Sequence, residues 1–445
     1  MYDIRGVVED DFPQPVVVDL GRAFGTFVRR RGGASIALSG DVRLTTPDLK
    51  KWFGEGLLST GVDVVDIGIV PTPTNYFSMF HLKIDGAVQI TGSHNPPEFN
   101  GFKLSYQQGA VYGDQIQQLR SLMKTSDFEV GEGTLKEVDL LTTYMDMLAE
   151  KISLDRPLKV VMDCGNAAAA LAAPEIFKRL GVQLTELYCT VDGRFPNHHP
   201  DPTELRNLQD LIAEVKTGGY DVGIAYDGDA DRIGVVDEHG QVIFADTLLA
   251  IFLEEVARPG EPIVFDVKCS QALEEEILRH GAVPVMWKTG HSLIKEKMRE
   301  LKVALAGEMS GHIFFGDEYY GYDDAIYVSL RLIRLLSRTR EPLSALAAKI
   351  PTYHSTPELR LECPTDDEKF KIARAAEDYF KANYDCITID GVRIKFGDGW
   401  GLVRASNTQP VIVCRFEART ALRLEEIKSL VLTKLLDFGE ITLAE

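Results

Sequence analysis

Three segments of this chain repeat one plan, in which an apolar strand ends near an aspartate and is followed by a helical stretch, a glycine and a second strand. The first strands are Ile36–Leu38, Val160–Met162 and Ile263–Phe265, and the second strands start at Gly61, Gly181 and Gly281. Glycine is the expected residue just past a helix, because it enters the left-handed conformation without strain. Strand–helix–strand units of this size form right-handed crossovers in a mostly parallel sheet. The repeat therefore predicts three similar α/β domains.

The pattern changes after about residue 351. Residues 358–362 and 387–394 alternate between apolar and polar types, which is typical of half-buried antiparallel strands, and residues 369–383 between them have the pattern of an amphipathic helix. We therefore predict three α/β domains with mixed, mostly parallel sheets plus a C-terminal α+β domain, all around one central cleft. The predicted domain boundaries are 1–138, 139–241, 242–350 and 351–445.

The charge of the chain limits its partners. It has 48 basic and 67 acidic residues, a formal net charge of −19, so its surface should repel nucleic acids and anionic membranes. An anionic substrate must then be held by a local cationic pocket or by a metal. The six cysteines lie far apart without a CxxC pair, as expected for reduced thiols in a cytosol. Without a signal peptide or an apolar run of about 18 residues, we expect a cytoplasmic protein.

A serine follows one of the predicted buried strands. Residues 87–90 form an apolar run that leads directly into Thr91-Gly92-Ser93-His94-Asn95-Pro96-Pro97, and Lys103 follows shortly after. Open α/β sheets bind ligands at the carboxyl ends of their strands. Ser93, on a loop stiffened by prolines and close to His94 and Lys103, suits a nucleophile or a phosphate carrier. The alternative is an ordinary serine-rich turn.

The second segment carries three carboxylates at the equivalent position. Asp227, Asp229 and Asp231 are spaced at i, i+2 and i+4 with small residues between them, so that the backbone can curl around one cation. Oxygen ligands without cysteine or histidine favour Mg²⁺ over zinc. Arg232 follows directly and could hold the oxygens of a transferring phosphoryl group. The alternative is a solvated acidic turn.

The third segment ends in Glu308-Met309-Ser310-Gly311-His312. The Glu308 carboxylate and the Ser310 hydroxyl could bind sugar hydroxyls, and His312 could act as a general acid or base near neutral pH. A structural histidine in a glycine-bearing loop is the alternative. Lys268 and His291 also follow apolar strands of this segment, where each is either a ligand-binding residue or an ordinary surface residue or helix cap.

The C-terminal domain contains a loop suited to phosphate. The glycine-rich stretch 397–401 leads into residues 403–410, whose polar members are Arg404, Ser406, Asn407 and Thr408. A guanidinium, two hydroxyls, an amide and backbone N–H groups together make a good set of donors for a phosphate dianion.

In chain order, these motifs are Tyr2-Asp3-Ile4-Arg5-Gly6, Thr91–Pro96, Asp227–Arg232, Glu308–His312 and Arg404–Thr408. Together they resemble the α-D-phosphohexomutase family along nearly the whole chain. The sequence Gly307–His312 looks like that of the phosphomannomutase/phosphoglucomutase branch. The phosphoglucosamine mutase branch, which usually has Gln in place of Met309, is the alternative.

The resemblance implies a four-domain, heart-shaped enzyme in which Ser93 is the phosphoserine. A phosphate oxygen on Ser93 would complete the Mg²⁺ shell together with the three aspartates, and Tyr2 and Arg5 would belong to the substrate site. Two positions depart from the family pattern. Ala230 stands where the family commonly has glycine, and we expect this to be tolerated only with a negative φ. Ser39-Gly40-Asp41 also lacks the arginine that the family often has before this aspartate.

The reaction implied is the reversible interconversion of hexose 1-phosphate and hexose 6-phosphate, with mannose and/or glucose as the sugar and hexose 1,6-bisphosphate as intermediate and activator. Lys103, His291 and His312 are the candidates for moving the hydroxyl proton. A phosphosugar is the expected partner, and we expect a monomer or a small homo-oligomer. A Mg²⁺-dependent sugar phosphatase and a non-catalytic phosphosugar-binding protein are the alternatives from other functional classes.

Overall fold

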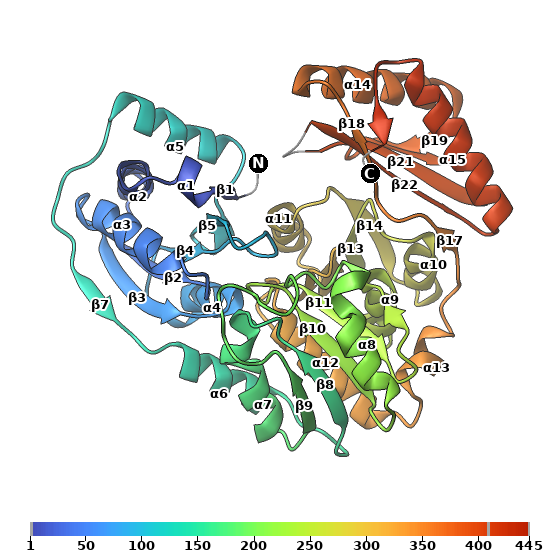
Figure 1. The fold of residues 1–445 in the computed structure, drawn as a ribbon, viewed down its shortest axis with the longest axis horizontal. Helices are drawn as coiled ribbons and strands as arrows, with labels where there is room; N and C mark the ends of the chain where they lie inside the picture. The colour runs from blue at the N-terminus through green and yellow to red at the C-terminus, as the bar shows by residue number, and fades with distance from the viewer. Residues whose placement is uncertain (1–2, 407–409, 444–445) are drawn as a thin grey trace. The chain divides into compact units, whose positions relative to one another are not determined.

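The computed structural model describes residues 3–406 and 410–443, and the chain forms two compact units. Unit 1 consists of Met1–Ala245 and Ser310–Ala347, and unit 2 consists of Asp246–Met309 and Ala348–Glu445. Figure 1 shows the elements of both units coloured by their position in the chain. The chain crosses between the units three times, and one of these crossings lies inside the predicted loop 308–312.

The first sheet of unit 1 has the strand order β1 (Ile4–Val7), β5 (Phe99–Tyr106), β4 (Gly86–Ile90), β2 (Ser35–Gly40), β3 (Asp63–Ile69) and β7 (Leu135–Glu137), with β6 (Gly109–Ala110) beside β5. Strands β4, β2, β3 and β7 are parallel, whereas β1 and β5 are antiparallel to their neighbours. Helices α2 (Gln14–Arg29), α3 (Thr46–Leu58) and α5 (Asp114–Thr125) share one core with one face of this sheet. Helix α4 (Thr72–His81) covers the other face, where Asn75 donates a hydrogen bond to Ser39.

The second sheet of unit 1 has the order β12 (Val242–Ile243), β11 (Ile233–Asp237), β10 (Val222–Tyr226), β8 (Lys159–Asp163) and β9 (Gln183–Leu187). Strands β10, β8 and β9 are parallel, and β11 returns antiparallel beside β10. Helices α7 (Ala173–Arg179) and α8 (Gln209–Lys216) pack against these strands, and α6 (Leu141–Lys151) precedes them. Residues 227–232 are therefore the connection of a β-hairpin at the carboxyl end of a buried parallel strand.

Unit 2 contains the third parallel arrangement, β14 (Val283–Trp287), β13 (Pro262–Asp266) and β15 (Leu305–Gly307). Helices α10 (Gln271–Arg279) and α11 (His291–Leu301) alternate with these strands, and α9 (Ala245–Val256) precedes them. The strand order of the C-terminal sheet is β19 (Asp385–Ile387), β20 (Val392–Lys395), β21 (Gly399–Ala405), β22 (Val411–Ala418), β18 (Leu359–Glu362) and β23 (Thr442–Leu443), with β17 (His354–Ser355) beside β22. The pairs of this sheet are antiparallel. The predicted mixed α/β sheets and α+β C-terminal region are confirmed.

The alternating pattern of residues 387–394 predicted one strand, but the structure divides this stretch between two. It contains the end of β19 and the start of β20, which pair antiparallel, and the turn between them includes Gly391 at φ +73°. A side chain at Gly391 would also lie 2.3 Å from the carbonyl oxygen of Val403. The alternation predicted strand structure correctly, but a glycine that both enters the left-handed region and lies against its neighbour divides the stretch.

The C-terminal sheet uses its two faces differently. One face packs with α14 (Asp366–Asn383) and α15 (Ala421–Leu436) into an apolar core, and Figure 1 shows both helices on the same side of the sheet. The other face carries Arg393, whose guanidinium lies 3.7 Å from the centre of the Trp400 ring. Arg393 donates to the carbonyls of Val267 (2.6 Å) and Cys269 (2.8 Å), so this sheet binds the loop after β13.

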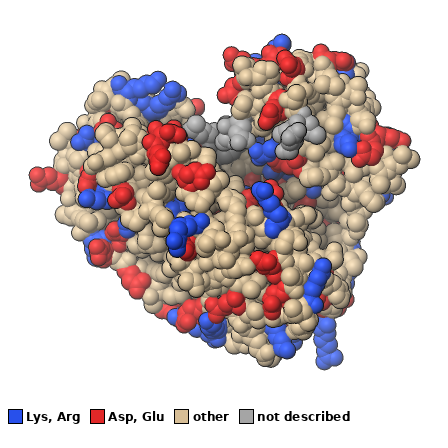
Figure 2. All heavy atoms as spheres, in the orientation of Figure 1, with Lys and Arg blue, Asp and Glu red and all other residues tan. Residues whose placement is uncertain are grey.

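The surface drawn in Figure 2 carries Lys and Arg side chains interspersed with Asp and Glu side chains. Within residues 3–406 and 410–443, no helix combines the length and the apolar character that crossing a bilayer requires. In the same part of the chain all six cysteines are free thiols, although the sulfurs of Cys164 and Cys189 lie only 3.3 Å apart.

Asp324 anchors helix α12 (Ala325–Arg338) in unit 1. Its carboxylate caps the helix by accepting a hydrogen bond from the N–H of Tyr327 (2.8 Å), and it also accepts from the hydroxyls of Tyr144 (2.8 Å) and Tyr319 (2.7 Å). Burial raises the pKa of Asp324 to about 6, even though the hydroxyl and N–H donors favour the ionised form. Near neutral pH, ionisation of the Asp324 carboxyl therefore lowers the stability of the folded state.

We predict that Asp324 makes folding stability depend on pH. The folded pKa of about 6 lies above the ordinary value of 3.8, so the stability that Asp324 contributes is present below pH 3.8 and is lost as the pH rises through 6. The difference corresponds to on the order of 3 kcal/mol. The free energy of unfolding of wild type, measured by urea denaturation relative to Asp324→Asn, should fall by up to this amount between roughly pH 4 and pH 7. The exposed variant Asp367→Asn is the control, and parallel pH curves for wild type and Asp324→Asn would contradict the assignment.

Candidate functional site

Ser93 lies fully buried in the loop that follows β4. Its backbone is in the left-handed region at φ +50°, and its N–H donates to the hydroxyl of Thr91 (2.8 Å). The Ser93 hydroxyl donates to Oδ2 of Asp227 (3.1 Å) and lies 3.1 Å from Nδ1 of His94. Burial lowers the pKa of His94 well below its ordinary value, and the nearby charges of Arg232 and Arg5 lower it further. His94 is therefore a neutral neighbour of this hydroxyl at pH 7.

Arg43 holds the serine loop in place. This buried guanidinium donates to four backbone carbonyls of the loop, those of Ser93 (2.7 Å), Asn95 (2.5 Å), Pro96 (2.6 Å) and Phe99 (2.9 Å). Its Nε lies 3.2 Å from the Asp41 carboxylate, which also accepts a hydrogen bond from Thr91. An irregular buried loop must find partners for its carbonyls, and a single planar guanidinium supplies them here. The sequence lacks an arginine before Asp41, but the arginine two residues after it binds the loop.

The hairpin connection of the second sheet lies directly against the serine loop. A Cβ on Gly228 would come within 2.1 Å of the Ser93 carbonyl oxygen, so only glycine fits at this contact. The ring of Phe195, on a loop after β9, lies 5.1 Å from the Arg43 guanidinium. The two sequence motifs, far apart in the chain, thus form one site.

Asp227, Asp229 and Asp231 are all completely buried, and their carboxylate oxygens lie within 4.8 Å of one another. Oδ1 of Asp227 accepts the N–H groups of Asp231 (3.0 Å) and Arg232 (3.1 Å), so the turn curls around this carboxylate. Oδ2 of Asp229 accepts the hydroxyl of Thr72 (2.5 Å) and the ammonium of Lys103 (2.6 Å). Lys103 also donates to Oδ2 of Asp231.

The electrostatics of the turn follow from this crowding. Burial raises the pKa of Asp227 well above its ordinary value, and repulsion from Asp229 and Asp231 raises it further. Burial would also raise the pKa of Asp229, but the Lys103 ammonium and the Thr72 hydroxyl lower it below the ordinary value. The pKa of Lys103 is raised, because the attraction of the two carboxylates outweighs its burial. Crowding therefore disfavours the ionised form of Asp227, whereas Lys103 and Thr72 stabilise the ionised form of Asp229.

The residues fit a hard divalent cation. Oδ1 of Asp229 and Oδ1 of Asp231 are buried, and within the described part of the chain neither accepts a hydrogen bond. Lys103 binds the Oδ2 atoms of these residues and leaves the Oδ1 atoms for another positive group. Buried carboxylate oxygens without a donor are costly unless a cation neutralises them. Three carboxylates and a serine oxygen are ligands of the type that Mg²⁺ prefers.

The expected negative φ at Ala230 is wrong. The structure gives φ +65°, and its backbone N–H donates to the carbonyl of Asp227 (3.2 Å) while its carbonyl accepts from Ala325 (3.1 Å). These two hydrogen bonds hold the alanine in the left-handed region despite the cost of its methyl group, because curling the turn around the carboxylates requires this conformation.

Arg232 and His312 extend the site in unit 1. Nε of Arg232 donates to Nε2 of His312 (3.0 Å), and both residues flank the turn of carboxylates. Ser310 and His312 lie on either side of Gly311, which has φ +96° and whose carbonyl accepts the N–H of Ile233 (3.2 Å). Arg5 lies 3.5 Å from the amide oxygen of Asn95 in the serine loop.

The remaining predicted residues belong to unit 2. Oε1 of Glu308 accepts the N–H of Gly290, so Glu308 contacts the start of α11, whose first residue is the buried His291. Lys268 lies 3.3 Å from the carboxylate of Glu358. Arg404 lies 3.2 Å from Asp390, which also accepts the N–H of Thr289.

The Asp390 contacts connect Arg404 to the segment that binds Glu308. Ser406 donates its N–H to Val411 (2.9 Å), and its carbonyl accepts from Lys369 (2.8 Å). Tyr2, Asn407 and Thr408 lie outside the described residues. Sequence reasoning did not identify Arg43, Thr72 and Asp390 as parts of the site. Only the position of Arg43, beside an aspartate at the end of a repeat strand, could have indicated such a role.

Comparisons with known proteins cover most of the chain. Residues 1–130, 142–240 and 244–353 match the models of phosphoglucomutase/phosphomannomutase alpha/beta/alpha domains I, II and III, and residues 358–434 match the C-terminal domain of the same family. The solved structure of a phosphoglucomutase/phosphomannomutase family protein from Burkholderia thailandensis is 43% identical, covers 99% of this chain and 98% of its own, and superposes with a TM-score of 0.93.

Two curated relatives agree with this match. The phosphomannomutase/phosphoglucomutase of Pseudomonas aeruginosa is 45% identical over 431 residues, which is 96% of this chain and 93% of the relative. The phosphoglucomutase of Neisseria gonorrhoeae is 41% identical over 434 residues, covering 96% and 94% of the two chains. The chain therefore belongs to the phosphoglucomutase/phosphomannomutase family.

Proposed function

We propose that this enzyme interconverts hexose 1-phosphate and hexose 6-phosphate, with mannose or glucose as the sugar, through a phosphoserine at Ser93. The observation that carries the proposal is the contact between the buried Ser93 hydroxyl and Asp227, one of three carboxylates suited to a divalent cation. The family match and the curated relatives support the reaction class. Mannose 1-phosphate and glucose 1-phosphate are the substrates with which to test it.

Phospho-Ser93 transfers its phosphoryl group to the free hydroxyl of a bound hexose phosphate, which gives hexose 1,6-bisphosphate. The bisphosphate reverses its orientation and returns the other phosphoryl group to Ser93. Arg43 keeps the serine oxygen fixed during both transfers, because it binds the carbonyl of Ser93 itself and three others in the same loop. Arg232, one residue beyond the carboxylates, stabilises the charge on the transferring group.

We propose that Ser93, Asp227, Asp229 and Asp231 hold Mg²⁺. When bound, the ion supplies Lewis-acid stabilisation of phosphoryl charge. Lys103, with its ammonium on two of these carboxylates, holds the turn and adds positive charge to it. His312 is then the better candidate for moving the hydroxyl proton, and His291 is the second candidate.

The substrate groups that do not react need their own contacts. We propose that Glu308, Ser310 and Lys268 bind the sugar hydroxyls. Arg404, together with Ser406, Asn407 and Thr408, binds the phosphate that is not reacting, and Tyr2 and Arg5 complete the substrate site. Asp390 keeps the Arg404 guanidinium in place from 3.2 Å. The enzyme has four domains, with boundaries at 138/139, 241/242 and 350/351, and the four sheets support this division. It acts in the cytoplasm, as the free cysteines suggest, and as a monomer or a small homo-oligomer.

Product analysis distinguishes the alternatives. With one sugar 1-phosphate and a trace of hexose 1,6-bisphosphate, a mutase yields the 6-phosphate isomer, a phosphatase yields free phosphate, and a binding protein yields neither. Glucosamine 1-phosphate as a third substrate tests the phosphoglucosamine mutase alternative.

We expect Ser93→Ala to lower kcat by at least about 10³-fold, because the acceptor oxygen is removed. Mass spectrometry of the purified wild-type enzyme should find a phosphate on the peptide that contains Ser93. Ser121→Ala, which changes a serine on the exposed side of α5, is the matched control and should keep wild-type turnover. A fully active enzyme that is phosphorylated only elsewhere would contradict the assignment.

Removing Mg²⁺ with EDTA should abolish turnover, and adding Mg²⁺ should restore it. Asp229→Asn removes one ligand charge and should weaken Mg²⁺ binding, measured by calorimetry, roughly tenfold or more. The exposed variant Asp48→Asn serves as the control. Turnover that persists at the wild-type level after complete chelation would rule out the metal site.

We expect Arg43→Lys to lower kcat/KM roughly 10- to 100-fold, since an ammonium cannot reproduce a planar fork that reaches four carbonyls. The rate at which hexose 1,6-bisphosphate phosphorylates Ser93 should fall with it, while Mg²⁺ binding changes little. Arg120→Lys on the exposed surface is the matched control. Unchanged phosphorylation kinetics in Arg43→Lys would show that the loop keeps its shape without this guanidinium.

A further inference from the structure

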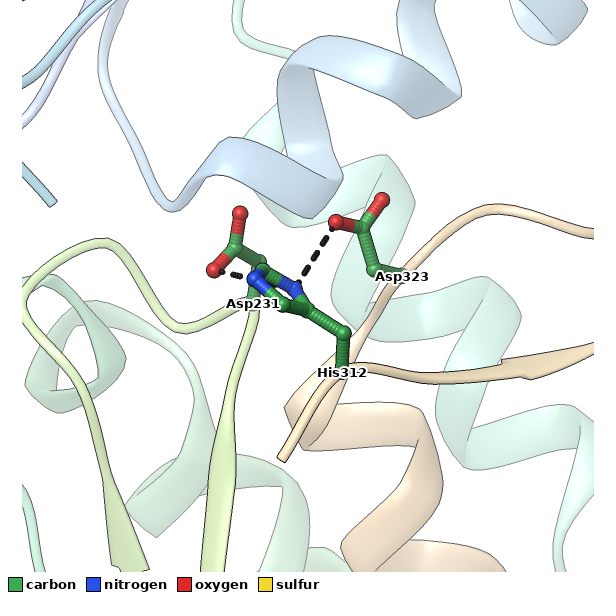
Figure 3. A group of neighbouring side chains, drawn as sticks. All are labelled: Asp231, His312 and Asp323. Atoms are coloured by element: carbon green, nitrogen blue, oxygen red, sulfur yellow. Dashed lines mark ion pairs between the residues drawn. The ribbon is translucent and has the colours of Figure 1, made fainter. Parts of the chain in front are cut away.

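His312 lies between two carboxylates in unit 1. Figure 3 shows its ring between Asp231 and Asp323, with Nδ1 3.0 Å from Oδ2 of Asp323 and 3.6 Å from Oδ1 of Asp231. All three side chains are buried, since Asp231 and Asp323 are 0% exposed and His312 is 3% exposed. Asp231 belongs to the turn of carboxylates, whereas Asp323 lies outside that turn, in the segment before α12.

The backbone determines where the Asp323 side chain points. Asp323 forms an antiparallel bridge with Phe314, which follows His312 by two residues and lies in β16 (Ile313–Phe315). The next residue, Asp324, is in an extended conformation (φ −145°, ψ 95°) and caps α12. Successive side chains of an extended segment point to opposite sides. The Asp324 carboxylate therefore binds the tyrosines, while that of Asp323 lies beside the imidazole.

The other ring nitrogen has a donor as its partner. Nε of Arg232 donates to Nε2 of His312 at 3.0 Å, and a guanidinium has no acceptor atom. Nε2 must therefore be the unprotonated nitrogen of the neutral ring, and the ring proton is on Nδ1. A proton on Nδ1 lies next to the Asp323 carboxylate. The two neighbours of the ring thus favour the same tautomer.

We propose that Asp323 is a positioning residue that holds His312 in the Nδ1–H tautomer and orients Nε2 for proton transfer. Asp323 is suited to this because its place is set twice, by the backbone bridge to Phe314 and by the anchoring of its neighbour Asp324 at the start of α12. The catalytic part of this inference rests on the proposed function, in which His312 moves the hydroxyl proton. When Arg232 turns toward a phosphoryl group, Nε2 becomes available.

The tautomer is measured directly. Selective ¹⁵N-histidine labelling of the full chain, with His312→Asn to assign the signal among the nine histidines, reports which ring nitrogen carries the proton at alkaline pH. Wild type should show the Nδ1–H form. Because Arg232 favours the same tautomer, Asp323 is tested in an Arg232→Ala background: Arg232→Ala should keep the Nδ1–H form, and Arg232→Ala/Asp323→Asn should lose it. The exposed variant Asp367→Asn is the control and should keep the wild-type form. An Nδ1–H form that persists in the double variant, or an Nε2–H form in wild type, overturns the inference.

Kinetics with glucose 1-phosphate test the catalytic part. Asp323→Asn should lower kcat roughly 10- to 100-fold and leave KM within about twofold, because the ring is misoriented while the substrate contacts remain. The exposed variant Asp367→Asn is the control and should retain the wild-type kcat. If Asp323→Asn keeps the wild-type kcat although the double variant has lost the Nδ1–H form, the catalytic part of the inference is wrong. If His312→Asn keeps the wild-type kcat, the proposed role of His312 fails, which is a separate result from the tautomer measurement.

Discussion

The site depends on the burial of three carboxylates in a single hairpin turn. Asp227, Asp229 and Asp231 are removed from water, where like charges at this separation could not persist without compensation. The fold supplies part of that compensation from elsewhere in the chain, with the Lys103 ammonium from β5 and the hydroxyl of Thr72 at the start of α4. Two oxygens remain without donors in the described structure, and the turn is therefore built to receive a cation.

The serine loop shows how the fold prepares a nucleophile. A buried loop with a residue in the left-handed region has carbonyls that no strand or helix satisfies. Arg43 binds four of them, and Gly228 of the metal turn leaves room for the carbonyl of Ser93. The serine hydroxyl contacts a carboxylate of the turn because two loops from different sheets pack directly against each other. Asp323 has a comparable role in the proposed chemistry, since it acts on the imidazole beside it.

Sequence reasoning works best where one property of the chain repeats locally. The strands, helices and glycines of the three segments are such features, and they predicted the mixed sheets and the loops at the strand ends. It was wrong about the backbone of Ala230, because two hydrogen bonds to distant and near backbone groups override the preference of an alanine. It also predicted one strand at 387–394, where contact with Val403 helps to make a turn. The contact between Cys164 and Cys189 could not be predicted, because the two residues are 25 positions apart in the sequence.

The sequence by itself determined the fold class and the chemical identity of the loops, since hydrophobic periodicity, glycine positions and the spacing of three aspartates are properties of neighbouring residues. Tertiary structure decided which partners those groups have. Arg43 reaches the serine loop, Lys103 reaches the aspartates 126 and 128 residues away, and Asp323 reaches His312 only after the strands pair and α12 is capped. Hydrogen bonds and charge compensation act through space over a few ångströms, so a pattern along the chain predicts the groups but not their contacts.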